Sequence, residues 1–258
     1  MLILFLLIYI VFMLSIFSPK TFLRDLLVGF TDVHNHILPG IDDGAKTVEE
    51  SIDLINELNN LGFKEFIATP HTMNDYYPNT YETIKNAHNT VLQALTKNLS
   101  NIKIGYSSEY MMDSHFENLL EENKIIPLKD SLILVEMSYL QPPINLEEII
   151  YKIGVAGYEP ILAHPERYAF YHKNYEYYKT LKKLGCKFQI NMLSLTSQYG
   201  ESVTKTANRL LKDGMIDYIA SDTHHKRHVS KIGSLKLNKN QVTYLKPIIT
   251  ETNLIFSS

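Results

Sequence analysis

The chain has a single cysteine and no long run of basic residues, and each of these features argues against one class of protein. Among the 258 residues only Cys186 carries a thiol, which excludes an internal disulfide framework and favours a reducing compartment. Lys and Arg number 25 against 28 Asp and Glu, for a net charge of −3, so no surface that tracks nucleic-acid phosphates is expected. Internal repeats, linkers and low-complexity segments are also missing from the sequence, which predicts one folded domain.

Charge is absent from the first 18 residues, MLILFLLIYIVFMLSIFS. As a helix this segment would be roughly 27 Å long, close to the roughly 30 Å hydrocarbon thickness of a membrane. Lys20 and Arg24 follow it, which would place the rest of the chain on the cytoplasmic side. We therefore expect residues 1–18 to anchor a cytoplasmic domain, residues 19–258, to the inner face of the membrane. The alternatives are a mistaken start site, with the true protein beginning near PKTFLRDLL, and a buried or surface helix.

Helical and strand patterns alternate through the rest of the chain. Thr47 and Glu50 form a capping-box pattern that opens one helix, and further helices are expected over 81–99, 146–156, 175–184 and 201–213. Between them lie seven short β-branched or aromatic runs, so the pattern predicts right-handed crossovers and parallel strands. We expect an α/β fold with a closed or nearly closed barrel. For the last fifteen residues the sequence suggests a short helix and gives no clearer pattern.

Six of the seven strand runs end at side chains that can hold a metal ion, and only KFQI does not. A barrel of parallel strands brings these ends to one rim, where such enzymes build their active sites. His34 and His36, two residues apart in extended chain, point to the same side. The expected donors are one of Asp42 and Asp43 together with His34, His36, His71, Glu109, Glu136, His164, Asp222 and His224.

Nine donors are too many for one ion and suit two or three. Imidazole nitrogen mixed with carboxylate oxygen favours zinc, manganese or iron over magnesium or calcium. Arg167 lies three residues beyond His164, and its guanidinium matches the oxygens of a phosphate; the alternative is a salt bridge to Glu166 or a helix carboxylate. The remaining histidines are expected to have structural roles: His88, His115, His172, His225 and His228.

The motifs VHNHILPGIDDGAKT, ATPH, SSEYMMD, LVEMSY, LAHPERY and SDTHH resemble the polymerase-and-histidinol-phosphatase (PHP) superfamily. Within it they are similar to the bacterial metal-dependent protein-tyrosine phosphatases of capsule and exopolysaccharide clusters. The resemblance runs from about Thr31 to His228, and HILPGIDDGA is its most specific part. It implies a distorted seven-stranded barrel of the PHP type.

The resemblance also implies how the donors divide among three metal ions, often manganese. His34, His36, Glu109 and Asp222 would hold the first ion, and Glu109 would bridge to a second held by Glu136 and His164. Asp43, His71 and His224 would hold the third, which favours Asp43 over Asp42. Arg167 would contact the phosphate. A second basic residue is implied after SDTHH, where Lys226, Arg227 and His228 compete and Arg227 is preferred.

We therefore hypothesise hydrolysis of phosphotyrosine in protein by a metal-activated hydroxide. The cysteine route is missing, because a C-x5-R loop from Cys186 would need arginine where Met192 stands. The expected partner is a membrane-bound bacterial tyrosine kinase that regulates capsule or exopolysaccharide production. One alternative is a small-molecule phosphoesterase, acting on histidinol phosphate or a sugar phosphate. Another is a tethered regulatory protein with a degenerate metal site, and the oligomeric state stays open.

Overall fold

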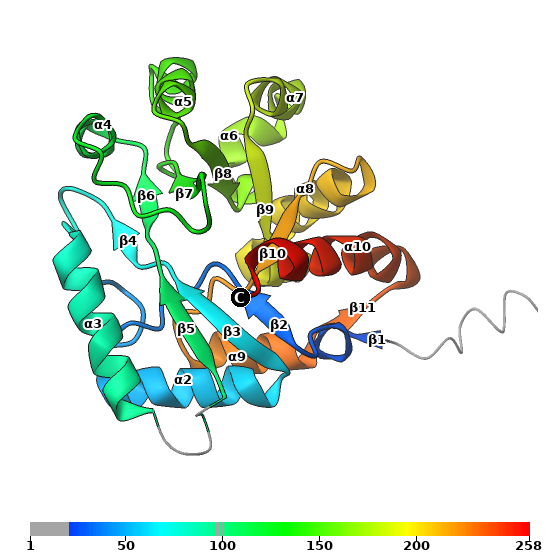
Figure 1. Cartoon of the computed structure of the whole chain (residues 1–258). Helices are drawn as coiled ribbons and strands as arrows, with labels where there is room; N and C mark the ends of the chain where they lie inside the picture. The colour runs from blue at the N-terminus through cyan, green and yellow to red at the C-terminus, as the bar shows by residue number, and fades with distance from the viewer. Residues whose placement is uncertain (1–20, 96–98, 100) are drawn as a thin grey trace, which may run out of the picture.

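The computed structural model describes residues 21–95, 99 and 101–258, and its strands form three sheets (Figure 1). A six-stranded sheet has the order β10-β9-β8-β7-β6-β4, a three-stranded sheet the order β2-β3-β5, and β1 pairs with β11. Every pairing inside the two larger sheets is parallel, whereas β1 and β11 are antiparallel. The strands are β1 (Thr21–Phe22), β2 (Phe30–Asp32), β3 (Phe63–Ala68), β4 (His71–Thr72), β5 (Lys103–Tyr106), β6 (Glu109–Met111), β7 (Leu132–Glu136), β8 (Glu159–Ala163), β9 (Lys187–Asn191), β10 (Tyr218–Ala220) and β11 (Lys236–Leu237).

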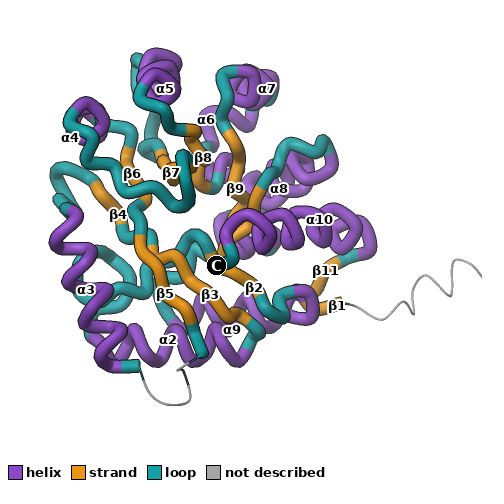
Figure 2. Tube along the Cα trace, viewed as in Figure 1, coloured by secondary structure: helices purple, strands orange, loops and turns teal. Residues whose placement is uncertain are grey.

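Helices surround these strands, as the purple segments of Figure 2 show. The expected α/β fold with parallel strands is confirmed. The helices are α2 (Val48–Asn60), α3 (Tyr81–Ala94), α4 (Ser114–Glu121), α5 (Leu146–Val155), α6 (Ala169–His172), α7 (Glu176–Lys183), α8 (Glu201–Lys212), α9 (Lys226–Ser234) and α10 (Lys239–Phe256), with 3-10 turns η1 (Leu23–Leu26), η3 (Pro165–Arg167), η4 (Met192–Leu195) and η5 (Ser197–Tyr199).

Two helix boundaries differ from the expectation by more than one residue. Helix α3 ends at Ala94 because Leu95 adopts an extended backbone. At the other end of the chain, α10 is 18 residues long and is not a short helix. Its start is defined by Asn238, whose side chain accepts a hydrogen bond from the backbone N–H of Gln241, and this cap lies before the fifteen residues that carried no clear pattern.

The capping pattern at α2 forms only in part. The Thr47 side chain accepts a hydrogen bond from the backbone N–H of Glu50, as the sequence predicts. The Glu50 carboxylate, however, accepts from the backbone N–H of Lys46 instead of Thr47. The helix start is therefore correct, while one of its two reciprocal bonds has shifted by one residue.

Direct contacts join the edges of the two larger sheets. Beyond β2 and β10, Asn35 and Thr223 form a parallel bridge, and the backbone N–H of Asp222 donates to the carbonyl of His34 at 2.8 Å. Asp32 receives hydrogen bonds from the backbone N–H and the hydroxyl of Ser221 at 2.9 and 2.6 Å. Burial raises the pKa of Asp32 to about 6, although these bonds act to lower it. The ends of β2 and β10 are thus held side by side.

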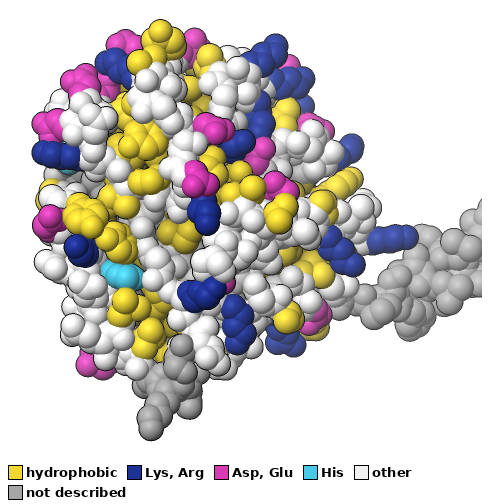
Figure 3. All heavy atoms as spheres, viewed as in Figure 1, with side chains coloured by type: hydrophobic (Ala, Val, Ile, Leu, Met, Phe, Trp, Pro, Cys, Tyr) yellow, Lys and Arg dark blue, Asp and Glu magenta, His cyan; other side chains and the backbone are white. Residues whose placement is uncertain are grey.

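Two apolar clusters support the strands. The larger one contains most buried side chains of the helices and packs them on the strands. The second draws on strands of both larger sheets and on the end of α10, with Leu134, Ile161, Ala220 and Phe256 among its members. The chain end lies beside the beginnings of strands, because the backbone N–H of Ser258 donates to Glu65 of β3. In Figure 3 hydrophobic and charged side chains of both signs are interspersed on the face viewed.

The apolar segment 1–18 lies outside the described residues, so its predicted helix is not part of the structure presented here. Among the helices that are described, none is both long and apolar enough to cross a bilayer.

Candidate metal centre

All nine predicted donors converge at one end of the strands, although His71 and Glu109, which lie beyond the ends of β3 and β5, are the first residues of β4 and β6. They form four overlapping groups, and within each group one donor atom per residue lies within 4.8 Å of the others. The groups are His36, Asp43, His71 and His224; His34, His36 and Asp222; His34, Glu109 and His164; and His71, Glu109 and Glu136. The shared members make one continuous centre, in which His71 belongs both to the Asp43 side and to the Glu136 side.

Two hydrogen bonds orient the histidines that follow β2. The Nδ1–H of His34 donates to Oε1 of Gln189 at 2.7 Å, and that of His36 donates to Oδ2 of Asp42 at 2.7 Å. Each bond fixes the ring and leaves its Nε2 for the centre. The two Nε2 atoms lie 3.4 Å apart, and that of His36 is 3.4 Å from Oδ1 of Asp222. Both imidazoles therefore present a lone pair to the same space.

The two acidic residues of the PGIDDG turn have different environments. Asp42 is buried, bonds His36 and accepts the backbone N–H of Gly44 at 2.9 Å. Asp43 is half exposed, and its Oδ1 is 3.3 Å from Nε2 of His224. A side chain at Gly44 could not fit, because its Cβ would lie 2.0 Å from the carbonyl oxygen of His36. The turn thus makes Asp42 an orienting group and Asp43 a candidate ligand.

Glu109 lies at the middle of the centre. Its Oε1 accepts from Nε2 of His164 at 3.0 Å, and its Oε2 is 3.1 Å from Nε2 of His34. Oε2 is also 3.1 Å from Nδ1 of His71, which in turn is 2.9 Å from Oε1 of Glu136. One carboxylate thereby contacts donors from three other strand ends.

A divalent ion fits these residues, because several buried donor atoms are close together without being hydrogen-bonded. Nδ1 of His71, Oε2 of Glu109 and Oε1 of Glu136 make no hydrogen bond among the described residues, despite separations of 2.9 and 3.1 Å. Two ligands about 2.1 Å from one ion, at roughly 90–110°, lie about 3.0–3.4 Å apart. The observed separations match ligand atoms around a common ion.

The backbone is strained at two of the donors. His164 and Asp222 adopt positive φ values of 35° and 51°, a left-handed conformation that costs non-glycine residues about 1–3 kcal/mol. His164 directly follows β8 and Asp222 lies two residues beyond the end of β10, and the strained turns place their side chains in the centre. Such strain is typical of functional sites.

The centre shifts the pKa values of its members in opposite directions. Burial acts to raise the pKa of Glu109, but the nearby His34 and His71 hold it well below its ordinary value. Burial acts to lower the pKa of His36, while the nearby carboxylates of Asp42, Asp222 and Glu109 raise it well above its ordinary value. The carboxylate of Glu109 is therefore kept ionised, as a metal ligand must be, whereas a metal ion that binds His36 has to displace a proton from its imidazole.

Arg167 is fixed at the edge of the centre by an ion pair and two aromatic rings. Its Nη1 donates to Oδ2 of Asp222 at 2.9 Å, so the alternative of a salt bridge to Glu166 is wrong. The guanidinium carbon lies 4.6 Å from the ring centre of Tyr139 and 4.3 Å from that of Tyr199. Asn191 also donates to Oδ2 of Asp222, at 2.5 Å.

The three basic candidates after SDTHH are placed differently. Lys226 pairs with Asp53 at 2.6 Å, and His228 is buried. Arg227 is exposed on the first turn of α9 and makes no ion pair or side-chain hydrogen bond with the described residues. It lines a cavity of about 530 Å³ together with Asp43 and His224. Arg227 is thus the candidate with an available guanidinium beside the centre.

Sequence patterns alone missed the residues that orient the donors. Gln189 and Asn191 belong to β9, whose run ends in no ligand, and they hold His34 and Asp222 instead. Their alternate positions on a strand put both on the face of the donors, which is a signal that the sequence does contain. Tyr139 and Tyr199 beside Arg167 carried no such signal.

A cavity of about 660 Å³ opens over the centre and is lined by Glu136, His164, Arg167 and Asp222. Tyr76 and Tyr77, two tyrosines that could frame an aromatic group, also line it. Tyr168 and Tyr171 are buried packing residues.

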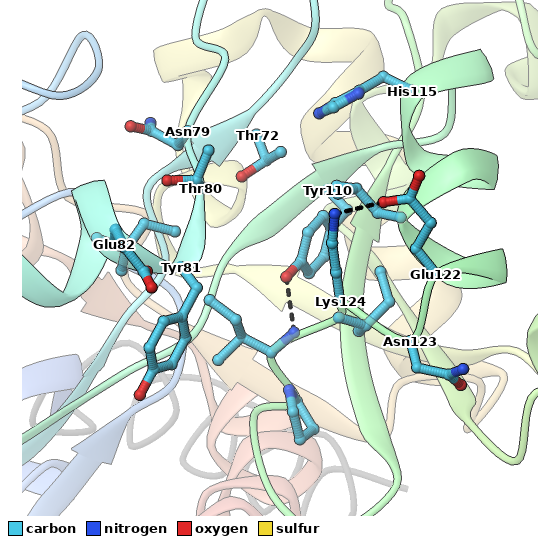
Figure 4. Close-up of a pocket in the computed structure, with 15 residues that line it drawn as sticks. Thr72, Asn79, Thr80, Tyr81, Glu82, Tyr110, His115, Glu122, Asn123 and Lys124 are labelled. Atoms are coloured by element: carbon cyan, nitrogen blue, oxygen red, sulfur yellow. Dashed lines mark hydrogen bonds and ion pairs between the residues drawn. The ribbon is translucent and has the colours of Figure 1, made fainter.

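A third cavity, of about 720 Å³, is lined by residues of β4, α3, β6 and α4 (Figure 4). Thr72 and Tyr110, which line it, each follow a donor in a strand and therefore point away from the centre. Lys124 and Glu122 pair at 2.6 Å at its edge, and the backbone N–H of Ile126 donates to the Tyr110 hydroxyl. It lacks converging donors among the described residues.

The chain is similar to known proteins over most of its length. Residues 30–239 match the family described as capsular polysaccharide synthesis, CpsB/CapC. Tyrosine-protein phosphatase YwqE of Bacillus subtilis is 30% identical over 195 residues, which cover 75% of this chain and 77% of that protein. Tyrosine-protein phosphatase CpsB of Streptococcus pneumoniae is 28% identical, with 75% and 82% covered.

A solved structure is similar to this chain in both fold and sequence. It is one of the crystal structures of YwqE from Bacillus subtilis and CpsB from Streptococcus pneumoniae, which are described as unique metal-dependent tyrosine phosphatases. The TM-score is 0.75 with 25% identity, over 88% of this chain and 94% of the other. With its match over residues 30–239, the chain belongs to the CpsB/CapC family of capsular polysaccharide synthesis proteins.

Proposed function

We propose that this protein is a metal-dependent phosphatase that hydrolyses phosphotyrosine in protein. The observation that carries the proposal is the convergence of nine metal-type donors beside one guanidinium, with six of the donors and the guanidinium lining a single open cavity. The relatives named tyrosine-protein phosphatase support the same activity. The proposed substrate is a bacterial tyrosine kinase that regulates capsule or exopolysaccharide production.

The proposed cofactor is two or three divalent ions, manganese first and zinc or iron as alternatives. His34, His36, Glu109 and Asp222 would hold one ion, Glu109, Glu136 and His164 a second, and Asp43, His71 and His224 a third. When bound, such ions act as Lewis acids and lower the pKa of a coordinated water. His71 belongs to one group with Asp43 and to another with Glu136, so it is placed to bind either the second or the third ion.

The charge of the centre calls for an anionic substrate. Its four ligand carboxylates and the orienting carboxylate of Asp42 count −5 and Arg167 counts +1, which makes −4. Two divalent ions would change this to 0 and three to +2. A phosphate monoester carries roughly −1.5 to −2 at pH 7 and would balance that excess. An anion also separates the guanidinium from the ions that would otherwise repel it.

Arg167 and Arg227 are the proposed contacts to the phosphate. The guanidinium of Arg167 is held by Asp222 and flanked by Tyr139 and Tyr199, so it is ordered before substrate arrives and can offset charge on the phosphate oxygens. Arg227 borders the Asp43 side. The phenol that leaves from phosphotyrosine has a pKa of about 10, so it departs more easily than a serine alkoxide.

We also propose that the strands form one distorted seven-stranded barrel of the PHP type. Only two residues separate β3 from β4 and β5 from β6, so each pair can act as one strand that passes from one sheet to the other. The Asn35–Thr223 bridge joins the remaining edges. These contacts support closure around the second apolar cluster.

Residues 19–258 are proposed as the phosphatase domain and residues 1–18 as a tether to the inner face of the membrane. The support for the tether is the uncharged segment followed by Lys20 and Arg24. A tethered enzyme would meet a membrane-bound kinase at raised effective concentration without further contacts. If this is right, the full-length protein sediments with membranes on cell fractionation, and a variant that lacks residues 2–18 does not. Equal distribution of both forms would refute the tether.

Removing the metal should abolish activity, while blocking the thiol should not. Burial raises the pKa of Cys186 to about 12, so the thiol stays protonated and unreactive. We expect a chelator to inactivate the enzyme and iodoacetamide at pH 8 to leave it active. His34→Ala and Glu109→Ala should each lower kcat by more than about a hundredfold, since loss of an orienting partner alone costs about 10–100-fold.

The control for these variants is His115→Ala, a histidine outside the centre. Elemental analysis of each purified protein would show whether metal content falls together with activity. Full activity in a metal-free sample would contradict the proposed chemistry.

The choice of substrate separates the proposal from a small-molecule phosphoesterase with the same centre. We expect a phosphotyrosine peptide to give kcat/KM at least about tenfold above that of histidinol phosphate or a sugar phosphate. The physical reason is the phenol leaving group and the aromatic lining of the cavity. The reverse order of rates would favour the alternative, and no hydrolysis despite bound metal would favour a regulatory protein.

Tyr199 should act by positioning Arg167. A cation–π contact contributes about 0.5–2 kcal/mol, and 1 kcal/mol corresponds to about fivefold in affinity. We expect Tyr199→Leu to raise KM for phosphotyrosine and the inhibition constant of inorganic phosphate by roughly fivefold, with a smaller change in kcat. Tyr199→Phe keeps the ring and should restore both values. Equal effects of the two substitutions would show that the ring does not position the guanidinium.

A further inference from the structure

Three large apolar side chains are exposed around the mouth of the cavity over the metal centre. Tyr76 is 75% exposed, Tyr139 is 44% exposed and Leu140 is 90% exposed. All three line the same cavity as Arg167 and Asp222. They come from the segments that follow β4 and β7, each of which ends at or near a donor. We call these three residues the apolar rim.

The apolar rim is not explained by the packing of the protein itself. The side chains of Tyr76 and Leu140 make no hydrogen bond, ion pair or aromatic contact among the described residues. Single exposed apolar residues are common, but several around one functional cavity indicate a surface that binds a partner. Burying one such side chain contributes about 1.5–3 kcal/mol, enough to influence substrate choice.

Two carboxylates give the mouth of the cavity a negative charge beside the apolar rim. Asp75 and Asp113 line the same cavity, and neither pairs with a cation among the described residues. Asp113 accepts from the backbone N–H of Phe116 and Asp75 from the side chain of Asn74. Both carboxylates are therefore held in place, and they would repel an acidic side chain that approached the rim.

Tyr139 connects the rim to the reacting end of the cavity. Its ring lies 4.6 Å from the guanidinium of Arg167, and its hydroxyl is 3.4 Å from Nε2 of His164. If Arg167 holds the phosphate, the tyrosine ring of the substrate lies in the cavity that Tyr139 lines beside this guanidinium. The polypeptide that carries it then meets Leu140 and Tyr76.

We propose, on the basis of the function proposed above, that the apolar rim docks the substrate polypeptide beside its phosphotyrosine. The rim selects segments with apolar residues next to the phosphotyrosine and disfavours segments with acidic ones. Its occupant is the substrate chain itself, because the rim is continuous with the cavity that receives the phosphate.

The test uses the full-length protein with three substrates. Two synthetic peptides of equal length carry phosphotyrosine flanked by leucine and valine or by glutamate, and the third substrate is free phosphotyrosine. The wild type should give kcat/KM about tenfold higher for the apolar than for the acidic peptide. Leu140→Ser and Tyr76→Ser should each lower the ratio of kcat/KM for the apolar peptide to that for free phosphotyrosine by roughly five- to tenfold, mainly through KM.

Leu254→Ser is the matched control, since Leu254 is 71% exposed on α10 and lines no cavity described above. It should keep both the ratio and the peptide preference of the wild type. Two outcomes would overturn the proposed docking at the rim. One is equal rates on the two peptides, and the other is rim variants that lose activity equally on peptide and free phosphotyrosine. A wild type that hydrolyses none of the three substrates while it cleaves histidinol phosphate would overturn the proposed function, and the rim with it.

Discussion

The main constraint on this structure is that several buried carboxylates lie close together at one end of the strands. Glu109, Glu136 and Asp222 are buried, and like charges at such short range repel strongly where water is excluded. Imidazoles, Arg167 and, in the proposed enzyme, divalent ions offset that repulsion. A set of this kind is stable only when every member is held, because removing one partner leaves another charge uncompensated.

Much of the fold follows from this requirement. The left-handed turns at His164 and Asp222 and the glycine that lies against His36 are local costs that place donors. The bonds from Ser221 to Asp32 hold β2 beside β10, so that His34 and Asp222, from opposite ends of the chain, can lie 3.5 Å apart. Gln189 and Asn191 of β9 orient His34 and Asp222, which follow β2 and β10.

The sequence was sufficient to predict the parallel α/β fold and the meeting of the nine donors, because strand ends share one edge whatever the details of packing. It could not predict the partners of those donors. Asp42 and Asp43 are adjacent and chemically alike, and only the path of the turn around Gly44 separates an orienting carboxylate from a candidate ligand. The pairing of Arg167 with Asp222 in place of Glu166 depends on a contact between residues 55 positions apart. The rings beside Arg167 depend on the conformations of loops, which carry no periodic signal.

The second apolar cluster has an electrostatic consequence. Leu134 stands two residues before Glu136 on the same face of β7, and Ala220 ends β10 two residues before Asp222, so a hydrocarbon layer that includes Phe256 lies next to the acidic groups. That layer polarises weakly and admits no counter-ion. The charge of the centre is therefore screened by solvent only at the open mouth of the cavity. Any ion or anionic group that neutralises this charge has to enter through that mouth.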